Sequence, residues 1–178
     1  QVGAALGQQG GKAARRWGYR HKGIPDGQAE ILVFSGNFHG RTTTVVGFSS
    51  DAEYQAGFGP FTPGFRMVAY GDIAAVEQAM NGNVCAMLIE PIQGEAGIIM
   101  PPDGYLKALR QLADEHNCLL MCDEIQAGLG RTGKMLCCQH EDIRPDLVIL
   151  GKALSGGVYP VSAVVGDEKV LSVFEPGS

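Results

Sequence analysis

Reactive side chains stand directly after apolar runs that are typical of buried strands. Asp123 follows one such run, Lys152 follows the next, and Glu90 follows an earlier one. In a parallel sheet, the carboxyl ends of neighbouring strands meet at one edge, where ligands bind. Asp123 and Lys152 are 29 residues apart (152 minus 123), close to the roughly 30 residues of one strand–helix–strand unit. We therefore expect the carboxylate and the amine to share one edge of the sheet.

A lysine in this setting is typical of covalent chemistry with carbonyl compounds. Lys152 stands among glycines and small residues, and such an amine can form a Schiff base. A buried carboxylate such as Asp123 can keep a pyridine nitrogen protonated, which is the protein's share of pyridoxal phosphate chemistry. On spacing alone, the alternative is a Lys–Asp ion pair at the edge of the sheet.

Strand-like apolar runs alternate with helical patterns along most of the chain. Strands are predicted over residues 31–34, 66–70, 84–89, 118–122, 146–150 and 162–165. Helices are predicted over 72–80, capped by Asp72, over 104–116 and in a short segment from Asp167. Residues 40–48 are typical of a helix or an irregular segment, and 51–64 of a loop. This order predicts an α/β fold with a mostly parallel sheet.

Length and charge bound the classes of function. The chain has 178 residues, of which 45% are hydrophobic and 19% charged, enough for one folded domain with a core. Lys and Arg number 14 against 19 Asp and Glu, a net charge of −5, whereas nucleic-acid binding needs clustered positive charge. The apolar runs are far shorter than the roughly 18 residues of a membrane helix. We expect neither a nucleic-acid partner nor a membrane partner.

The cysteines admit two interpretations. There are five, at positions 85, 118, 122, 137 and 138. Cys137, Cys138 and His140 could suggest a metal site, but zinc needs four ligands at better spacing. Because the number is odd and three of the cysteines stand in apolar runs, we expect reduced, structural thiols.

Two glycine-rich motifs resemble nucleotide-binding loops without meeting their requirements. Residues 128–133 (GLGRTG) match the dinucleotide pattern, but no strand directly precedes them and no clear helix opens there. Residues 7–13 (GQQGGKA) resemble a P-loop, but the motif is one residue short and lacks the Ser or Thr for magnesium. We expect neither site.

Several longer motifs resemble the class III, pyridoxal-phosphate-dependent aminotransferases. They cover residues 88–97 (LIEPIQGEAG), 123–133 (DEIQAGLGRTG) and 150–157 (LGKALSGG). Within that class, residues 36–42 (GNFHGRT), 58–61 (FGPF) and 157–164 (GVYPVSAV) are most similar to the ornithine aminotransferases. The resemblance implies the type I aminotransferase fold, whose large domain is a three-layer αβα structure. Residues 1–178 would be the central part of that cofactor-binding domain, without the family's N-terminal segment and small C-terminal domain.

The resemblance also implies which residues bind the cofactor. Lys152 matches the Schiff-base lysine that later moves the proton, and Asp123 matches the carboxylate on the pyridine nitrogen. Gln126 matches the amide near the phenolic oxygen of pyridoxal phosphate. Phe38 matches the aromatic residue stacked on the ring, and His39 beside it is expected at the cofactor.

Further residues are implied for the phosphate and the substrate. Gly3 and Ala4 match the loop whose backbone N–H groups hold the cofactor phosphate at a helix N-terminus. Arg41 matches the arginine that takes the α-carboxylate of the substrate, for which a guanidinium fork is suited. Glu95 matches the acid that masks a second substrate-binding arginine, and Glu90 is expected to support the site from behind.

Some positions depart from the family or lack an assigned role. Val2 replaces the hydroxyl residue that helps to bind the phosphate in the family. Three glycines, at positions 7, 10 and 11, would each cost a helix roughly 1 kcal/mol against alanine, so we expect weak folding there. We interpret Arg131 and Thr132 as structural turn residues and Glu124 as a simple ion-pair partner.

The implied activity is transfer of the δ-amino group of ornithine to a 2-oxo acid such as 2-oxoglutarate, giving glutamate semialdehyde and glutamate. Two alternatives stay open: a catalytically inactive fragment, and a relative that acts on acetylornithine or 4-aminobutyrate. A homodimer is expected for the full-length enzyme, because the family's site forms between subunits. The family occurs in the mitochondrial matrix and in the cytosol, and either compartment fits this sequence.

Overall fold

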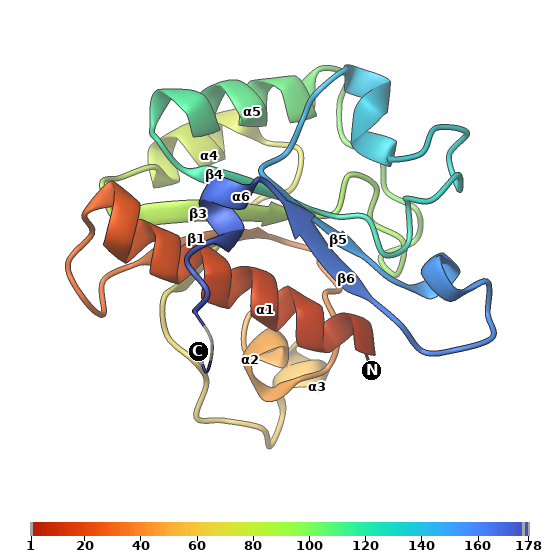
Figure 1. Ribbon diagram of the computed structural model, residues 1–178, viewed down its shortest axis with the longest axis horizontal. Helices are drawn as coiled ribbons and strands as arrows, with labels where there is room; N and C mark the ends of the chain where they lie inside the picture. The colour runs from red at the N-terminus through yellow and green to blue at the C-terminus, as the bar shows by residue number, and fades with distance from the viewer. Residues whose placement is uncertain (1, 176, 178) are drawn as a thin grey trace.

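A six-stranded sheet forms the centre of the molecule (Figure 1). The computed structural model describes residues 2–175 and 177, with side chains from residue 7 onward in that part. In spatial order the strands are β2 (Phe65–Val68), β1 (Glu30–Phe34), β3 (Val84–Ile89), β4 (Leu119–Asp123), β5 (Leu147–Leu150) and β6 (Ala163–Gly166). Neighbouring strands are parallel except β6, which runs antiparallel to β5. The predicted α/β fold with a mostly parallel sheet is confirmed.

Helices cover both faces of the sheet and complete three layers (Figure 1). One face carries α1 (Val2–Trp17), its continuation η1 (Gly18–Lys22) and α6 (Glu168–Leu171). The opposite face carries α4 (Ile73–Ala79), α5 (Tyr105–Glu115) and η2 (Cys137–Glu141). The short helices α2 (Thr43–Val46) and α3 (Ala52–Gln55) lie in the connection from β1 to β2, and η3 (Lys152–Ser155) follows β5.

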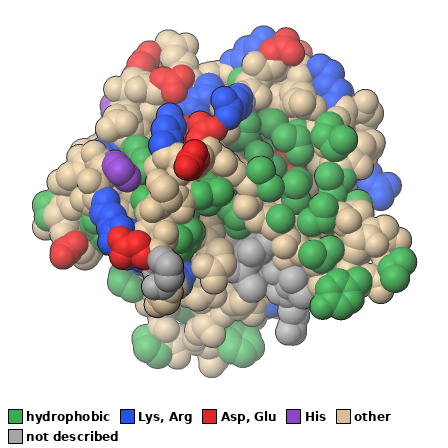
Figure 2. All heavy atoms as spheres, in the orientation of Figure 1, with side chains coloured by type: hydrophobic (Ala, Val, Ile, Leu, Met, Phe, Trp, Pro, Cys, Tyr) green, Lys and Arg blue, Asp and Glu red, His purple; other side chains and the backbone are tan. Residues whose placement is uncertain are grey.

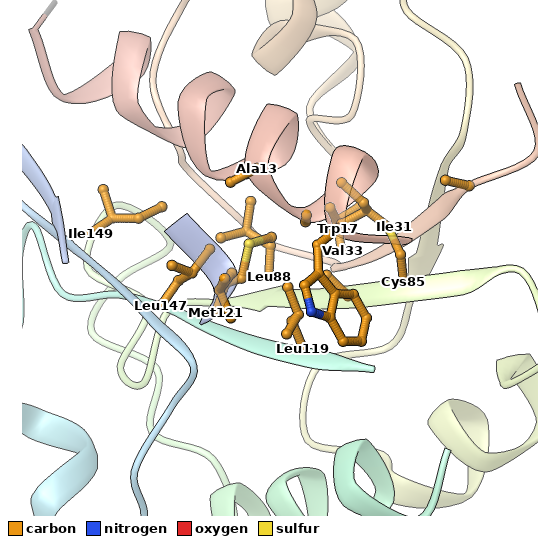
Figure 3. Packing of buried hydrophobic residues seen from close by; sticks show 14 of the residues in the cluster. Ala13, Trp17, Ile31, Val33, Cys85, Leu88, Leu119, Met121, Leu147 and Ile149 are labelled. Carbon is orange, nitrogen blue, oxygen red and sulfur yellow. The ribbon is translucent and has the colours of Figure 1, made fainter. Parts of the chain in front are cut away.

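The strands send alternate side chains into two separate cores. Ile31 and Val33 of β1 pack toward α1, whereas Leu32 and Phe34 pack toward α4 and α5. This alternation is the period of two expected of a strand. Figure 3 shows the first core, with Trp17 of α1 lying over the sheet. Every residue of β3 is buried, as expected for a central strand that is covered on both faces.

Helix α1 runs unbroken through the glycines that we expected to weaken it. Gly7, Gly10 and Gly11 are all buried. A Cβ at position 7 would lie 3.3 Å from the carbonyl oxygen of His39, and one at position 10 would lie 3.5 Å from Ile149. Glycine therefore lets the helix lie close to the sheet and to the segment after β1. Tertiary packing offsets the low helix propensity, as it does in most protein helices.

Most predicted elements are confirmed with small shifts at their ends. Strand β2 covers Phe65–Val68 instead of residues 66–70, and α4 begins after Asp72, whose carboxylate accepts a backbone N–H of the first turn at 3.0 Å. The prediction of a loop over 51–64 was incomplete, because α3 forms a helical turn there. The carboxylate of Asp51 caps this turn by accepting the N–H of Glu53 at 2.9 Å.

Neither glycine-rich motif has the backbone of a nucleotide-binding loop. Residues 7–13 are helical within α1, and residues 128–133 form turns from which no helix begins. All five cysteines are buried and free, as expected of structural thiols. Within the described residues, no group of three or more His, Cys, Asp and Glu side chains is placed to hold a metal ion.

The length of the helices and the distribution of charged and apolar side chains on the surface are relevant to membrane and protein partners. No helix in the described part of the chain is both long enough and apolar enough to cross a membrane. On the face shown in Figure 2, acidic and basic side chains lie beside one another. Hydrophobic side chains gather on the right of that view, on the side where Figure 1 places β6 and η3.

Candidate active site

The carboxyl ends of β3, β4 and β5 lie side by side and bring the predicted reactive residues to one edge. Asp123 ends β4, and Lys152 follows β5 after a single residue. The two strands pair through Asp123 and Ile149, and the N–H of Glu124 donates to the Ile149 carbonyl at 2.9 Å. Strand β1 lies beside β3 although β2 separates them along the chain. Open α/β sheets bind ligands at the carboxyl ends of strands near such a switch in strand order, and here the switch between β1 and β3 lies next to β4, which ends in Asp123.

The carboxylate of Asp123 is buried and held by two donors. It is 4% exposed. Nδ1 of His39 lies 2.7 Å from its Oδ2, and the N–H of Ile125 donates to its Oδ1 at 3.1 Å. We expected His39 at the cofactor, and the structure places its ring against Asp123. Nothing in the local sequence indicates this pair, because its members are 84 positions apart.

The environment of His39 favours a proton on Nδ1. Burial by itself would lower the pKa of His39, but the hydrogen bond to Asp123 and the charges of Asp123 and Glu90 raise it overall. A proton on Nδ1 suits a charged carboxylate at Asp123, since N–H donors to carboxylates form strong hydrogen bonds. Nε2 of His39 is buried and has no hydrogen-bond partner among the described residues.

Glu90 lies behind the Phe38 segment. It follows β3 directly and is 4% exposed. Its Oε2 accepts the backbone N–H of Phe38 at 2.9 Å. Burial raises the pKa of Glu90 to about 7, although the charge of His39 and the N–H groups of Phe38 and Gly94 act in the opposite direction. Glu90 therefore joins the loop after β1 to the end of β3.

Lys152 is exposed at a cavity of about 630 Å³. That volume is in the range of small-molecule sites. The cavity is lined by Ile125, Gln126, Gly128, Leu129, Gly130, Arg131, Lys152, Ala153 and Gly157. The backbone of Lys152 has a φ of 42°, in the left-handed region that residues with a Cβ rarely adopt. Unusual backbone of this kind is concentrated at functional sites.

Gln126 lines the same cavity as Lys152, next to a glycine that leaves room for it. A Cβ at Gly94 would lie 2.7 Å from Oε1 of Gln126. The sheet edge thus brings together Lys152, Asp123 and Gln126, three of the residues predicted to bind the cofactor. Arg131 also lines this cavity, whereas the sequence suggested only a turn residue.

Arg41 is exposed, and its guanidinium lies against two aromatic rings. Its Cζ is 4.7 Å from the ring centroid of Tyr54 and 5.5 Å from that of Phe38. The two rings meet edge to face with centroids 6.0 Å apart. The motif predicted Phe38 and Arg41. It missed Tyr54, which lies in the segment interpreted as a loop.

Three further predicted site residues lie in other segments, Glu95 after β3 and Gly3 and Ala4 in α1. Glu95 is exposed in the turn after β3 and forms no ion pair with any described residue. Gly3 and Ala4 belong to the first turn of α1, where the structure describes the helix backbone alone.

The prediction of an ion pair for Glu124 was wrong. Its carboxylate is 1% exposed and accepts the backbone N–H groups of Cys137 and Cys138 at 2.9 and 2.8 Å. A buried carboxylate can be satisfied by backbone donors as well as by a cation. Thr132 has the structural role expected of it, since its carbonyl lies 2.9 Å from Nε2 of His140.

Two further residues connect the strand ends, and sequence reasoning missed their roles. Gln93 is buried, and its Nε2 donates to the carbonyl of Ser35 at 2.7 Å. The hydroxyl of Tyr70 donates to the carbonyls of Glu90 and Pro91 at 3.2 and 3.1 Å. The available signal for Gln93 was its polar side chain between Ile92 and Gly94. The sequence around Tyr70 contained no comparable signal.

Comparison with known proteins decides the family. The profile of the aminotransferase class-III family matches residues 2–178. The chain belongs to the class-III aminotransferase family. It is 59% identical over 167 residues to ornithine aminotransferase 2 of Staphylococcus aureus, an alignment that covers 94% of this chain and 42% of that protein. That relative is bacterial, so it gives no support to a mitochondrial location.

Solved structures show the same fold. The ornithine aminotransferase from Toxoplasma gondii crystallised with oxidised glutathione has a TM-score of 0.97 and 44% identity, over 99% of this chain and 42% of that one. Pyridoxal phosphate partly occupies its active site. The acetylornithine aminotransferase from Elizabethkingia anophelis has a TM-score of 0.83 and 41% identity, over 100% of this chain and 41% of that one. This class-III chain therefore spans less than half the length of these relatives and has the fold of the pyridoxal-phosphate-dependent aminotransferases.

Proposed function

We propose that this chain forms the core of an enzyme that moves the δ-amino group of ornithine to a 2-oxo acid such as 2-oxoglutarate. Glutamate semialdehyde and glutamate would be the products. One observation carries the proposal: Lys152 and the buried Asp123 follow the adjacent strands β5 and β4, His39 contacts Asp123, and Lys152 lines a cavity that Gln126 also lines. Relatives named for ornithine support the choice of substrate.

The residues at this edge fit pyridoxal phosphate. Lys152 supplies an amine that can bond to a carbonyl carbon, and Asp123 supplies a buried carboxylate for a protonated ring nitrogen. Gln126 offers an amide, and Phe38 offers an aromatic ring. When bound, the cofactor would withdraw electrons from the carbon that carries the transferred amino group.

The phosphate would lie at the start of α1. The first N–H groups of a helix have no partner within the helix, and the helix dipole favours an anion there. Gly3 and Ala4 belong to this first turn. Helix α1 is 16 residues long, so its N-terminal end has the full effect of a helix terminus.

Each of the chain's own groups then has a defined task. Nζ of Lys152 would hold the cofactor covalently and, once released, carry a proton between atoms of the substrate. His39 keeps Asp123 oriented through Nδ1. Glu90 fixes the backbone that carries Phe38. Residues that orient a reacting group in this way contribute by removing freedom before the reaction.

Arg41 would bind the α-carboxylate of the substrate. Its side chain is exposed and makes no ion pair with any carboxylate in the described part of the chain. A planar guanidinium can pair with a carboxylate through two parallel hydrogen bonds. Glu95 would balance a second substrate-binding arginine, as the family resemblance implies.

Acetylornithine is the second candidate substrate. The similarity to the Elizabethkingia acetylornithine enzyme favours it, since 41% identity is close to the 44% found for the Toxoplasma ornithine enzyme. A panel of ornithine, acetylornithine and 4-aminobutyrate separates these activities. Ornithine should be turned over best, and equal or better turnover of another amine would overturn this choice.

Capture of the cofactor tests the site itself. The protein carrying this chain would be mixed with pyridoxal phosphate, reduced with borohydride and digested for peptide mass analysis. We expect a pyridoxyl mass on Lys152, its loss in Lys152→Ala and its retention in Lys134→Ala. A label spread over several lysines, or no label, would contradict the proposal. A label on Lys152 without turnover of any amine would indicate an inactive fragment.

We further propose that the enzyme is a homodimer. The segment around β6 exposes apolar side chains that a second copy would cover, with Val158 90%, Tyr159 70% and Val165 51% exposed. Exposed apolar patches commonly mark interfaces between proteins.

A further inference from the structure

The guanidinium of Arg41 is held by rings on two separate segments. Phe38 belongs to the loop after β1, whereas Tyr54 belongs to α3, in the connection to β2. Tyr54 makes the closer contact, with 4.7 Å between the Cζ of Arg41 and the ring centroid against 5.5 Å for Phe38. An arginine over an aromatic face gains about 0.5–1 kcal/mol at an exposed site.

The segment that carries Tyr54 is anchored on both sides of it. Asp51 caps α3, and Nε2 of Gln55 donates to the carbonyl of Ser49 at 2.7 Å. The hydroxyl of Ser50 accepts the N–H of Gly36 at 2.8 Å, which connects this segment to the end of β1. Tyr54 itself is half-buried. Its ring therefore has a fixed place from which to orient a neighbour.

The second ring is fixed as well. The backbone N–H of Phe38 donates to buried Glu90, and the Phe38 ring meets that of Tyr54 at an angle of 69°. A long arginine side chain on an exposed segment otherwise samples many rotamers, and ordering it on binding costs free energy. Because the two rings restrict the Arg41 side chain before a ligand binds, they lower the free-energy cost of ordering it on binding.

We propose that Tyr54 is a positioning residue that holds Arg41 ready for the carboxylate of the substrate and so favours carboxylate-bearing amines. This inference rests on the proposed function of Arg41. The Cζ of Arg41 lies over both rings, and its guanidinium N–H groups have no hydrogen-bond or ion-pair partner among the described residues. The ring contacts therefore leave those donors available for a carboxylate while they limit where the guanidinium lies.

Ligand pairs with and without a charge test this role. Valerate and pentanamide have the same five-carbon chain, and only valerate carries a carboxylate. We would measure their inhibition constants, with KM and kcat for ornithine, in the wild type and in Tyr54→Leu and Tyr54→Phe. Phe58→Leu is the matched control, because Phe58 is an exposed aromatic residue of the same segment, 59% exposed.

Tyr54→Leu should raise the valerate inhibition constant and the KM for ornithine roughly two- to five-fold, the equivalent of one cation–π contact. kcat and the pentanamide constant should not change. Tyr54→Phe keeps the ring and should behave as the wild type, as should Phe58→Leu. Unchanged constants in Tyr54→Leu would overturn the inference, and so would an equal loss of valerate and pentanamide binding or an equal effect of Phe58→Leu.

The measurements distinguish a failure of the proposed function from a failure of the role of Tyr54. If the wild type did not turn over ornithine, the activity would be wrong, yet calorimetric titration with valerate would still report on Tyr54. Wild-type turnover combined with equal valerate affinity in all variants would reject the role of Tyr54 alone. Circular dichroism of Tyr54→Leu checks that it folds, and Tyr54→Phe supplies the test of the ring in any case.

Discussion

Glu90, His39 and Asp123 are buried titratable side chains that come from the end of β3, the loop after β1 and the end of β4. Each is less than 5% exposed, and the group is held by the His39–Asp123 contact of 2.7 Å and by the N–H of Phe38 on Glu90. Burying ionisable groups is costly unless they are paired and hydrogen-bonded. We therefore predict that these groups serve the proposed active site.

The raised pKa values of Glu90 and His39 predict how stability changes with pH. Both groups bind a proton more tightly in the folded protein, so their contribution is complete below the unfolded pKa and is lost as pH rises through the folded pKa. For Glu90 that window runs from 4.5 to about 7. The free energy of unfolding should fall across it, with a slope that approaches about 1.4 kcal/mol per pH unit from this group.

Urea unfolding between pH 5 and pH 8 checks this sign. Glu90→Gln should flatten the slope, and the exposed Glu77→Gln on α4 should leave it unchanged. The lowered pKa values of Glu30 and Glu175 act below 4.5, outside this window. Equal slopes in the wild type and Glu90→Gln would show that Glu90 does not carry the effect.

Strand positions were the most predictable elements, because continuous apolar runs are a local property. The mostly parallel sense of the sheet followed from the alternation of strands and helices, whereas the strand order was not predicted. Helix α3 was not predictable from apolar spacing, since its turn depends on the Asp51 cap. The Asp123–His39 pair and the place of Tyr54 depend on contacts between distant segments, which no local pattern reports.

Strand β6 offers an element-scale prediction at a glycine. A Cβ at Gly166 would lie 2.6 Å from the carbonyl oxygen of Asp146 and would also meet Leu147 on β5. Gly166→Ala should therefore destabilise the fold by about 1–3 kcal/mol through overpacking. Urea unfolding measures this change. Gly82→Ala is the control, because nothing lies within 4 Å of a Cβ there, and an equal cost in both variants would contradict the packing argument.

At the scale of the whole molecule, the two edges of the sheet differ in a way that bears on assembly. Val158 lies in the apolar segment that leads to β6, whereas Met67 lies on β2 at the opposite edge and is 43% exposed. If the β6 side forms the dimer, a charge there should be buried without a partner.

Val158→Asp should therefore weaken the dimer at least about tenfold, or roughly 1.4 kcal/mol. Met67→Asp should leave it intact. Light scattering across a concentration series gives the mass of each variant. A wild-type monomer, or equal weakening by both substitutions, would contradict an interface on the β6 side.

The family resemblance predicted more of the candidate site residues than residue spacing did. Spacing placed Asp123 and Lys152 at one edge but left an ion pair open, and only the longer motifs singled out Gln126, Phe38 and Arg41. For Arg131 and Glu124, by contrast, the motifs did not predict the surroundings of the side chains. Their surroundings arise from the turns after β4, and a short motif does not specify which backbone groups such turns present.

The left-handed backbone conformation at Lys152 lowers the stability of the fold, although the proposed function requires an amine at this position. A residue with a Cβ loses about 1–2 kcal/mol in this conformation, whereas glycine adopts it freely. Lys152→Gly should therefore be more resistant to urea than Lys152→Ala by about 1 kcal/mol, and under the proposed function neither variant would capture the cofactor. Equal unfolding free energies would show that the surrounding loop relaxes. A lysine in this conformation lowers the stability of the fold relative to glycine, and that loss accompanies the placement of an amine at the cavity.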